Sequence, residues 1–177
     1  MNAIFLFAFP LLMFSTTLVL YDFEKEDTLE GWYVVNDGVM GGLSKGTLTT
    51  NKKGNAVFTG SVSLDNNGGF TSIRYNFEPA EVSAFTTVKL RIKGDGKRYQ
   101  FRVKSFSDER YSYINYFQTS GEWEVIELSL KDLYPSFRGQ RLQMPNYPIE
   151  AMSEISILIA NNKEERFQLL MDKIWLE

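Results

Sequence analysis

Asn36-Asp37-Gly38-Val39-Met40-Gly41-Gly42-Leu43-Ser44 is the stretch that decides the fold, because its composition does not suit the interior of a regular element. Three of the nine residues are glycines, and Asn-Asp stands at their head. Glycine tolerates positive φ, and Asn and Asp favour turns through hydrogen bonds to their own backbone. The apolar run Trp32–Val35 leads in, and the strand-like residues 46–50 follow. The stretch therefore predicts a long, specifically shaped turn between two strands.

The spacing of these glycines excludes two phosphate-binding motifs. Gly-x-x-Gly-Gly is not the dinucleotide fingerprint, and a strand rather than a helix is predicted after it. The stretch also lacks the Gly-Lys-Ser/Thr of a P-loop. Two roles stay open: the glycines set the backbone shape, or exposed N–H groups of the turn cradle a polar group. Asp37 is expected to brace the turn or to coordinate a cation, so Asn36 and Asp37 are candidate binding residues.

On both sides of the turn, apolar residues recur at every second position, which is the period of a half-buried strand. Gly94-Asp95-Gly96 predicts a hairpin between two such strands, and Pro79 is predicted to end another. Residues 131–148 contain three prolines and are predicted to form a long connection. About ten strands are predicted in all, within residues 18–23, 32–35, 46–50, 56–64, 70–77, 87–93, 99–104, 111–117, 123–130, 155–160 and 167–176.

This pattern predicts an all-β fold, an antiparallel β-sandwich of jelly-roll type. The aromatic content of 15% favours strands, and the length of 177 residues fits one domain with a sizeable core. We assign that domain to residues 18–177. Residues 1–17 contain the apolar run Ala3–Phe14 followed by small polar residues, which is typical of a secretory signal peptide. An exported protein, periplasmic or secreted and without a membrane span after cleavage, is expected. An N-terminal membrane anchor is the alternative, because Leu18–Leu20 is apolar again.

The chain contains no cysteine and no histidine, which excludes thiolate nucleophiles, disulfides and Ser-His-Asp or Cys-His mechanisms. A glycosidase needs two carboxylates at a set separation, and Asp108, Glu109, Glu122 and Glu124 fall at predicted loops or strand ends with nothing to pair them. We therefore expect a protein that is not an enzyme. The net charge of −3 and pI of about 5.2 argue against a nucleic-acid partner.

Three arginines are candidate binding residues because they alternate with the apolar rows of their strands. If their strands are neighbours, Arg74, Arg91 and Arg102 line one face of a sheet. Tyr111 and Tyr113, or Tyr116 from the other side of the same strand, would stack on a sugar ring there. The alternatives are a solvated face with interspersed charges and tyrosines that belong to the core.

Acidic residues in the first and last predicted strands suggest a possible metal site. Asp22 and Asp172 each stand among apolar residues, and terminal strands commonly pair in such sandwiches. A structural calcium held by these oxygens is therefore a weak candidate. No other cofactor is expected.

Several blocks of the sequence follow one another in a distinctive order: Trp32 with residues 36–44, residues 67–70 with Arg74, residues 94–99, Phe117, Thr119, Gly121 and Trp123, and residues 137–139. Taken together, these blocks resemble the complex I intermediate-associated protein 30 family. The resemblance implies a galactose-binding-like sandwich and membership in a group that includes an assembly chaperone of mitochondrial respiratory complex I. It favours a non-catalytic domain that binds a protein partner or assists assembly, with a carbohydrate-binding module as the alternative.

Overall fold

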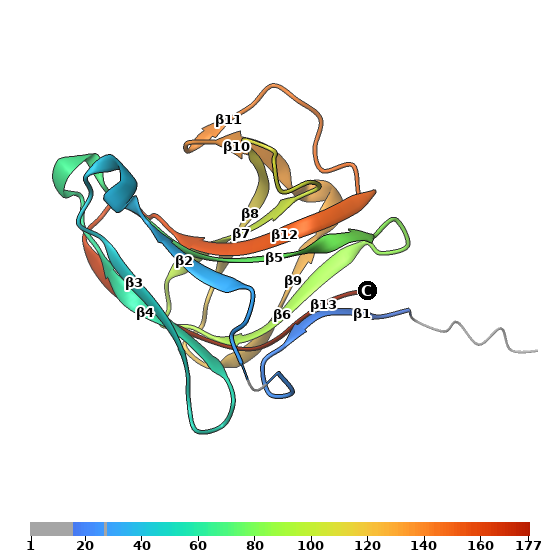
Figure 1. The fold of residues 1–177 in the computed structure, drawn as a ribbon, viewed down its shortest axis with the longest axis horizontal. Coiled ribbons are helices and arrows are strands. Elements are labelled where there is room, and N and C mark those ends of the chain that lie inside the picture. Colours follow the sequence, from blue (N-terminus) through green and yellow to red (C-terminus); the bar gives the residue numbers. More distant parts are fainter. Residues whose placement is uncertain (1–15, 27) are drawn as a thin grey trace, which may run out of the picture.

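A computed structural model describes residues 16–26 and 28–177, which form two antiparallel sheets packed face to face (Figure 1). This arrangement confirms the predicted all-β sandwich. The predicted signal segment falls almost wholly outside the described residues. Within them, no helix has the length and apolar character that crossing a bilayer requires.

The first sheet has six strands, and its longest strand lies at its centre. β1 (Leu18–Asp22) pairs with that strand, β13, as predicted for the first and last strands. The remaining order is β3 (Lys45–Thr50), β4 (Ala56–Val62), β13 (Glu165–Leu176), β6 (Thr87–Lys93) and β9 (Trp123–Ser129).

The second sheet has seven strands and carries the polar face discussed below. Three 3-10 helices, η1 (Asp37–Met40), η2 (Asp65–Asn67) and η3 (Leu130–Asp132), complete the described elements. The strand order is β11 (Gln140–Arg141), β10 (Tyr134–Phe137), β8 (Ser112–Gln118), β7 (Arg98–Lys104), β12 (Ala151–Ile159), β5 (Thr71–Glu81) and β2 (Trp32–Asn36).

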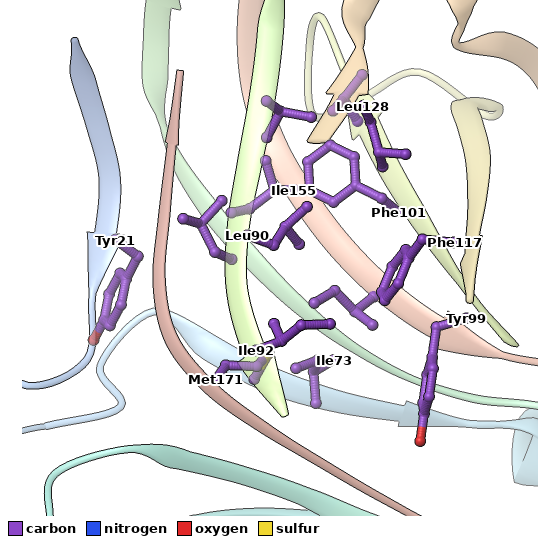
Figure 2. Close-up of a cluster of buried hydrophobic side chains, with 14 of the residues drawn as sticks. Tyr21, Ile73, Leu90, Ile92, Tyr99, Phe101, Phe117, Leu128, Ile155 and Met171 are labelled. Atoms are coloured by element: carbon purple, nitrogen blue, oxygen red, sulfur yellow. The ribbon is translucent and has the colours of Figure 1, made fainter. Parts of the chain in front are cut away.

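The core lies between the two sheets and consists of the alternate apolar residues that the period of two predicts. Leu90 and Ile92 of the first sheet meet Phe101 and Ile155 of the second, and all four side chains are almost fully buried (Figure 2). Burying one such side chain contributes about 1.5–3 kcal/mol. Alternation therefore places the remaining residues of each strand on the outer faces of the sandwich.

Two local predictions about strand ends are wrong. Gly94-Asp95-Gly96 does not close a hairpin, because β6 and β7 belong to different sheets and this turn carries the chain from one to the other. Pro79 does not end β5, which continues to Glu81. The pairing register of β12 on β5 shifts at this point and gives Pro79 no partner position, so its missing N–H breaks no ladder pairing.

The segment 131–148, predicted to be a long connection, contains a small hairpin. β10 and β11 pair with each other, and β10 also pairs with β8. The connecting residues Arg138 and Gly139 both have positive φ, at 49° and 79°. Such a two-residue loop matches the twist of a tight hairpin. In Figure 1 this hairpin rises at the edge of the seven-stranded sheet.

Candidate functional site

The side chain of Asp37 holds the glycine turn together. Asp37 begins η1 and is 0% exposed. Its Oδ1 accepts a hydrogen bond from the Ser44 N–H at 3.0 Å. Its Oδ2 accepts from the N–H groups of Gly69 at 2.7 Å and Phe70 at 3.2 Å. The polar group that the backbone cradles is therefore the protein's own carboxylate, which ties the turn to the loop before β5.

The glycines around Asp37 have different physical roles. Gly41 has a φ of +87°, which favours glycine. Gly42 is not in the left-handed region; a Cβ there would overlap the Asp37 carboxyl carbon. A Cβ on Gly68 would lie 2.7 Å from Asp37 Oδ2. Of these three glycines, Gly41 supplies positive φ, while Gly42 and Gly68 leave room for the carboxylate.

Hydrogen bonds also govern the protonation of Asp37 and the position of its neighbour. Burial raises the pKa of Asp37, but the hydrogen bonds from Ser44, Gly69 and Phe70 outweigh burial and hold that pKa below its usual value. Asn36 Oδ1 accepts from the Gly46 N–H at 3.0 Å and from the Thr71 hydroxyl. The structure therefore gives both candidate residues of the turn internal bonding partners.

Two of the three candidate arginines meet on the outer face of the seven-stranded sheet. In the pairing register, Arg74 of β5 and Arg102 of β7 are both opposite Ser156 of β12. The expectation that Arg91 joins them is wrong, because β6 belongs to the six-stranded sheet. Arg91 instead forms an ion pair with Asp172.

A pocket of about 420 Å³ opens on this face. One side is the Gly68–Phe70 loop that Asp37 holds, and the other is the turn of the β10–β11 hairpin. Leu158 contributes apolar surface. Five basic side chains line it and define what we call the cationic pocket: Arg74, Arg102, Lys104, Arg110 and Arg138.

The floor of the cationic pocket carries more positive than negative charge. Glu154 of β12 is buried and lies 4.0 Å from Arg74 and 3.6 Å from Lys104. Arg102 donates to Gln100 Oε1 at 3.0 Å, and no ion pair of Arg102 occurs among residues 16–26 and 28–177. Burial, together with repulsion from Arg74, lowers the pKa of Arg102 to about 10.

The candidate tyrosines Tyr111 and Tyr113 do not lie on this face, so the expectation that they stack on a ligand there is wrong. Tyr113 is 6% exposed, belongs to the core and packs on Tyr147 with ring centres 5.2 Å apart. Tyr111 packs against Tyr113 and the core, and its hydroxyl donates to Glu109. Tyr116, the alternative, is on the outer side of β8.

Two tyrosines and two arginines form a second feature of the outer face, next to the cationic pocket. The Arg98 guanidinium lies 4.5 Å from the centre of the Tyr116 ring, and that of Arg141 lies 4.6 Å from the Tyr134 ring. Gln100, which lines the pocket, donates to the Tyr116 hydroxyl at 3.1 Å. We call Arg98, Tyr116, Tyr134 and Arg141 the tyrosine patch.

The two acids proposed as a weak metal site each have basic partners. Asp22 lies 3.2 Å from Lys25 and 3.6 Å from Lys173, while Asp172 pairs with Arg91. In the part of the chain that the structure describes, no group of three acidic or other ligating side chains is arranged to hold a metal ion. The calcium site therefore stays a prediction.

Comparison with known protein families shows the family to which the chain belongs. The family model of the complex I intermediate-associated protein 30 (CIA30) matches residues 21–171, which is most of the chain. The chain belongs to the CIA30 family. This match confirms the resemblance inferred from the glycine turn and the later blocks.

The curated relatives carry the word mitochondrial in their names, and the match with this chain covers only part of each relative. "Complex I intermediate-associated protein 30, mitochondrial" of Drosophila melanogaster is 24% identical, covering 95% of this chain and 66% of that protein. Its namesake in Mus musculus is 22% identical, covering 88% of this chain and 55% of that protein. The chain thus spans just over half to about two thirds of these relatives. Their names point to mitochondria and contradict the expectation of an exported protein.

Solved structures with a similar fold include carbohydrate-binding modules. A family 11 module from Clostridium thermocellum, in complex with a mixed-linked tetrasaccharide, has a TM-score of 0.66 and 19% identity. The match covers 90% of this chain and 94% of that one. An exo-β-agarase matches with a TM-score of 0.56 and 14% identity, covering 90% of this chain but 25% of the enzyme. At these identities the likeness establishes the shared sandwich alone.

Proposed function

We propose that this CIA30-family chain is a non-catalytic binding domain that holds a protein partner during assembly of mitochondrial respiratory complex I. The family match over residues 21–171 and the names of the relatives support the assembly setting. The chain's lack of histidine and cysteine supports a role in binding rather than in catalysis.

The tyrosine patch is the observation that carries the proposal. Tyrosine and arginine are enriched at the energetic centres of protein interfaces, because each combines a large apolar area with polar groups. Tyr116 and Tyr134 are half-buried, and each ring is covered by an exposed arginine. A ring held in place in this way loses little side-chain entropy on binding. The patch therefore suits a protein surface with apolar and acidic groups.

The experiment replaces the protein in cells that lack it and follows both assembly and contact with the partner. Cells carry the wild type, a Tyr116→Ala/Tyr134→Ala double variant, or a Tyr33→Ala control, which removes an exposed tyrosine at the far strand β2 of the same sheet. Native gels of mitochondria measure mature complex I, and photo-crosslinking from Arg98 captures the partner.

We expect the double variant to yield about tenfold less crosslinked partner than the wild type and to accumulate assembly intermediates. The control should behave as the wild type. Thermal unfolding of the purified variants checks that both remain folded. A folded double variant that restores complex I fully and retains the crosslink would refute the proposed role of the patch.

A carbohydrate-binding module is the second candidate, and the two half-buried tyrosine rings of the same patch favour it, since tyrosine rings stack on sugars. A glycan array that includes mixed-linked β-glucans tests the candidate with the wild type and Tyr116→Ala. Binding that the substitution abolishes would support a sugar ligand. An array without signal, or a signal that the substitution leaves intact, would reject it.

A further inference from the structure

We propose that the cationic pocket binds the phosphate group of a small phosphorylated molecule. This site lies beside the tyrosine patch, and the proposal does not depend on the identity of a protein partner. Its evidence is the charge of the pocket floor, the hydrogen-bonding state of its arginines, and the size and lining of the cavity.

The floor has an excess charge that matches one phosphate. Arg74, Arg102 and Lys104 contribute three positive charges, and Glu154 contributes the single carboxylate that pairs with any of them among the described residues. Two positive charges are left without a counter-charge. A phosphate monoester carries about −1.5 to −2 at pH 7, whereas one carboxylate carries −1.

The arginines of the floor have donors available for such an anion. Arg74 Nε is buried and has no hydrogen-bond partner within the part of the chain that the structure describes, which is uncommon for a native buried donor. Arg102, which the register on β12 brings close to Arg74, donates a hydrogen bond to Gln100. Guanidinium groups bind phosphate through two parallel hydrogen bonds, so two neighbouring arginines would hold one phosphate from two sides.

The remainder of the pocket suits an organic group attached to the phosphate. The volume of about 420 Å³ exceeds what a phosphate alone would fill and lies within the usual range for small-molecule sites. Phe70 and Leu158 supply apolar walls. Exposed Arg110 and Arg138 stand over the ring of Phe137, with guanidiniums 5.5 and 5.3 Å from its centre. The rim is therefore basic and open to solvent.

Thermal unfolding and calorimetry of the intact protein test the proposal. The probes are inorganic phosphate, pyrophosphate and ribose 5-phosphate, with the dicarboxylate glutarate and potassium chloride at matched ionic strength as controls. Vesicles of phosphatidylcholine with and without phosphatidic acid test whether the phosphate can come from a lipid headgroup. The variants are Arg74→Gln and Arg102→Met, with Arg91→Gln on the other sheet as the matched control.

We expect a phosphorylated probe to raise the unfolding temperature, because a ligand that binds only the folded state stabilises it. Its affinity should exceed that for glutarate by about tenfold and fall by about tenfold in Arg74→Gln and Arg102→Met but not in Arg91→Gln. Arg102→Met should unfold at a temperature equal to or above that of the wild type without ligand, because it removes a partly buried charge that forms no ion pair with any described residue. Binding of phosphatidic acid vesicles alone would identify the source as a lipid.

Three results would overturn the proposal. The first is no thermal shift with any phosphate compound or phosphatidic acid vesicle. The others are an affinity for glutarate equal to that for the phosphorylated probe, or a loss of probe affinity in Arg91→Gln equal to that in the pocket variants. A pocket that prefers glutarate would indicate an acidic peptide instead. None of these results bears on the tyrosine patch, whose variants are tested by the partner crosslink, so the two proposals can fail separately.

Discussion

Replacing Asp37 should release the glycine turn from the loop before β5 and lower the stability of the whole domain. Asp37→Ala removes the acceptor of three backbone N–H groups, those of Ser44, Gly69 and Phe70. A buried donor left without a partner costs about 1–3 kcal/mol. The Ser44 bond is fully buried, whereas the other two are partly exposed and regain water. We therefore expect a loss of about 2–6 kcal/mol, made up of about 1–3 kcal/mol for the Ser44 donor and about 0.5–1.5 kcal/mol for each of the other two bonds. A loss of this size is a large share of the roughly 5–15 kcal/mol that stabilise a typical domain.

Asp37→Asn removes the charge of the side chain but keeps its shape, and the resulting loss of stability should depend on pH. The amide keeps the volume but has one acceptor oxygen, so we expect a loss of about 2 kcal/mol at pH 7. The folded-state pKa of Asp37 lies below its ordinary 3.8. Its carboxylate therefore contributes fully above the unfolded value, and the contribution is lost as pH falls through the folded value. The stability difference between wild type and Asp37→Asn should be constant from about pH 7 to 5 and shrink below about pH 4.

Urea unfolding followed by tryptophan fluorescence measures these differences, with Gly38→Ala as the control because a Cβ there meets nothing within 4 Å. Gly42→Ala, whose Cβ would overlap the carboxyl carbon, should cost about 1–3 kcal/mol in the wild type and less in the Asp37→Ala background. An Asp37→Ala protein as stable as the wild type would refute the bracing role. If Gly42→Ala costs as much stability in the Asp37→Ala background as in the wild type, then Gly42 does not serve to leave room for the carboxylate.

The remaining predictions contrast pairs of similar residues. Gly41→Val should destabilise by about 1–3 kcal/mol, because a branched residue is strained at a φ of +87°, and unchanged thermal unfolding would contradict this. Tyr113→Ala should cost about 3–5 kcal/mol in urea unfolding as a truncation in the core. Tyr116→Ala, on the outer face, should cost less than about 1 kcal/mol. Equal costs for the two tyrosines would contradict the assignment of faces.

The sequence predicted the strands well because a half-buried strand is a local pattern, whereas the sheet to which a strand belongs is not. The turn Gly94-Asp95-Gly96 has the residues of a hairpin, but Asp95 accepts hydrogen bonds from the Tyr99 hydroxyl and from the N–H of Gln168 on β13. These contacts hold a crossing between sheets. Arg91 was misplaced for the same reason, since nothing near it in sequence distinguishes β6 from a neighbour of β7.

The tyrosines of β8 show why alternation alone does not identify the inner face. Aromatic residues occur on both sides of that strand, so parity left Tyr113 and Tyr116 as open alternatives. Phe117, which lacks a polar atom, is in step with Tyr113 along β8 and lies in the core. Its position was the available signal that Tyr113 is internal. The β10–β11 hairpin was not predicted because its turn is Arg138-Gly139, whereas Asn or Asp usually precedes glycine in such loops.

The strand order has a consequence for how the chain folds. β12 is flanked by β7 and β5, and β13 by β4 and β6, so the last two strands in the sequence are central in their two sheets. Neither sheet can close until residues 151–176 have emerged from the ribosome. The earlier strands expose apolar faces and unpaired edges during that time. With so many contacts between distant residues, we expect slow folding that begins after synthesis of the domain is nearly complete.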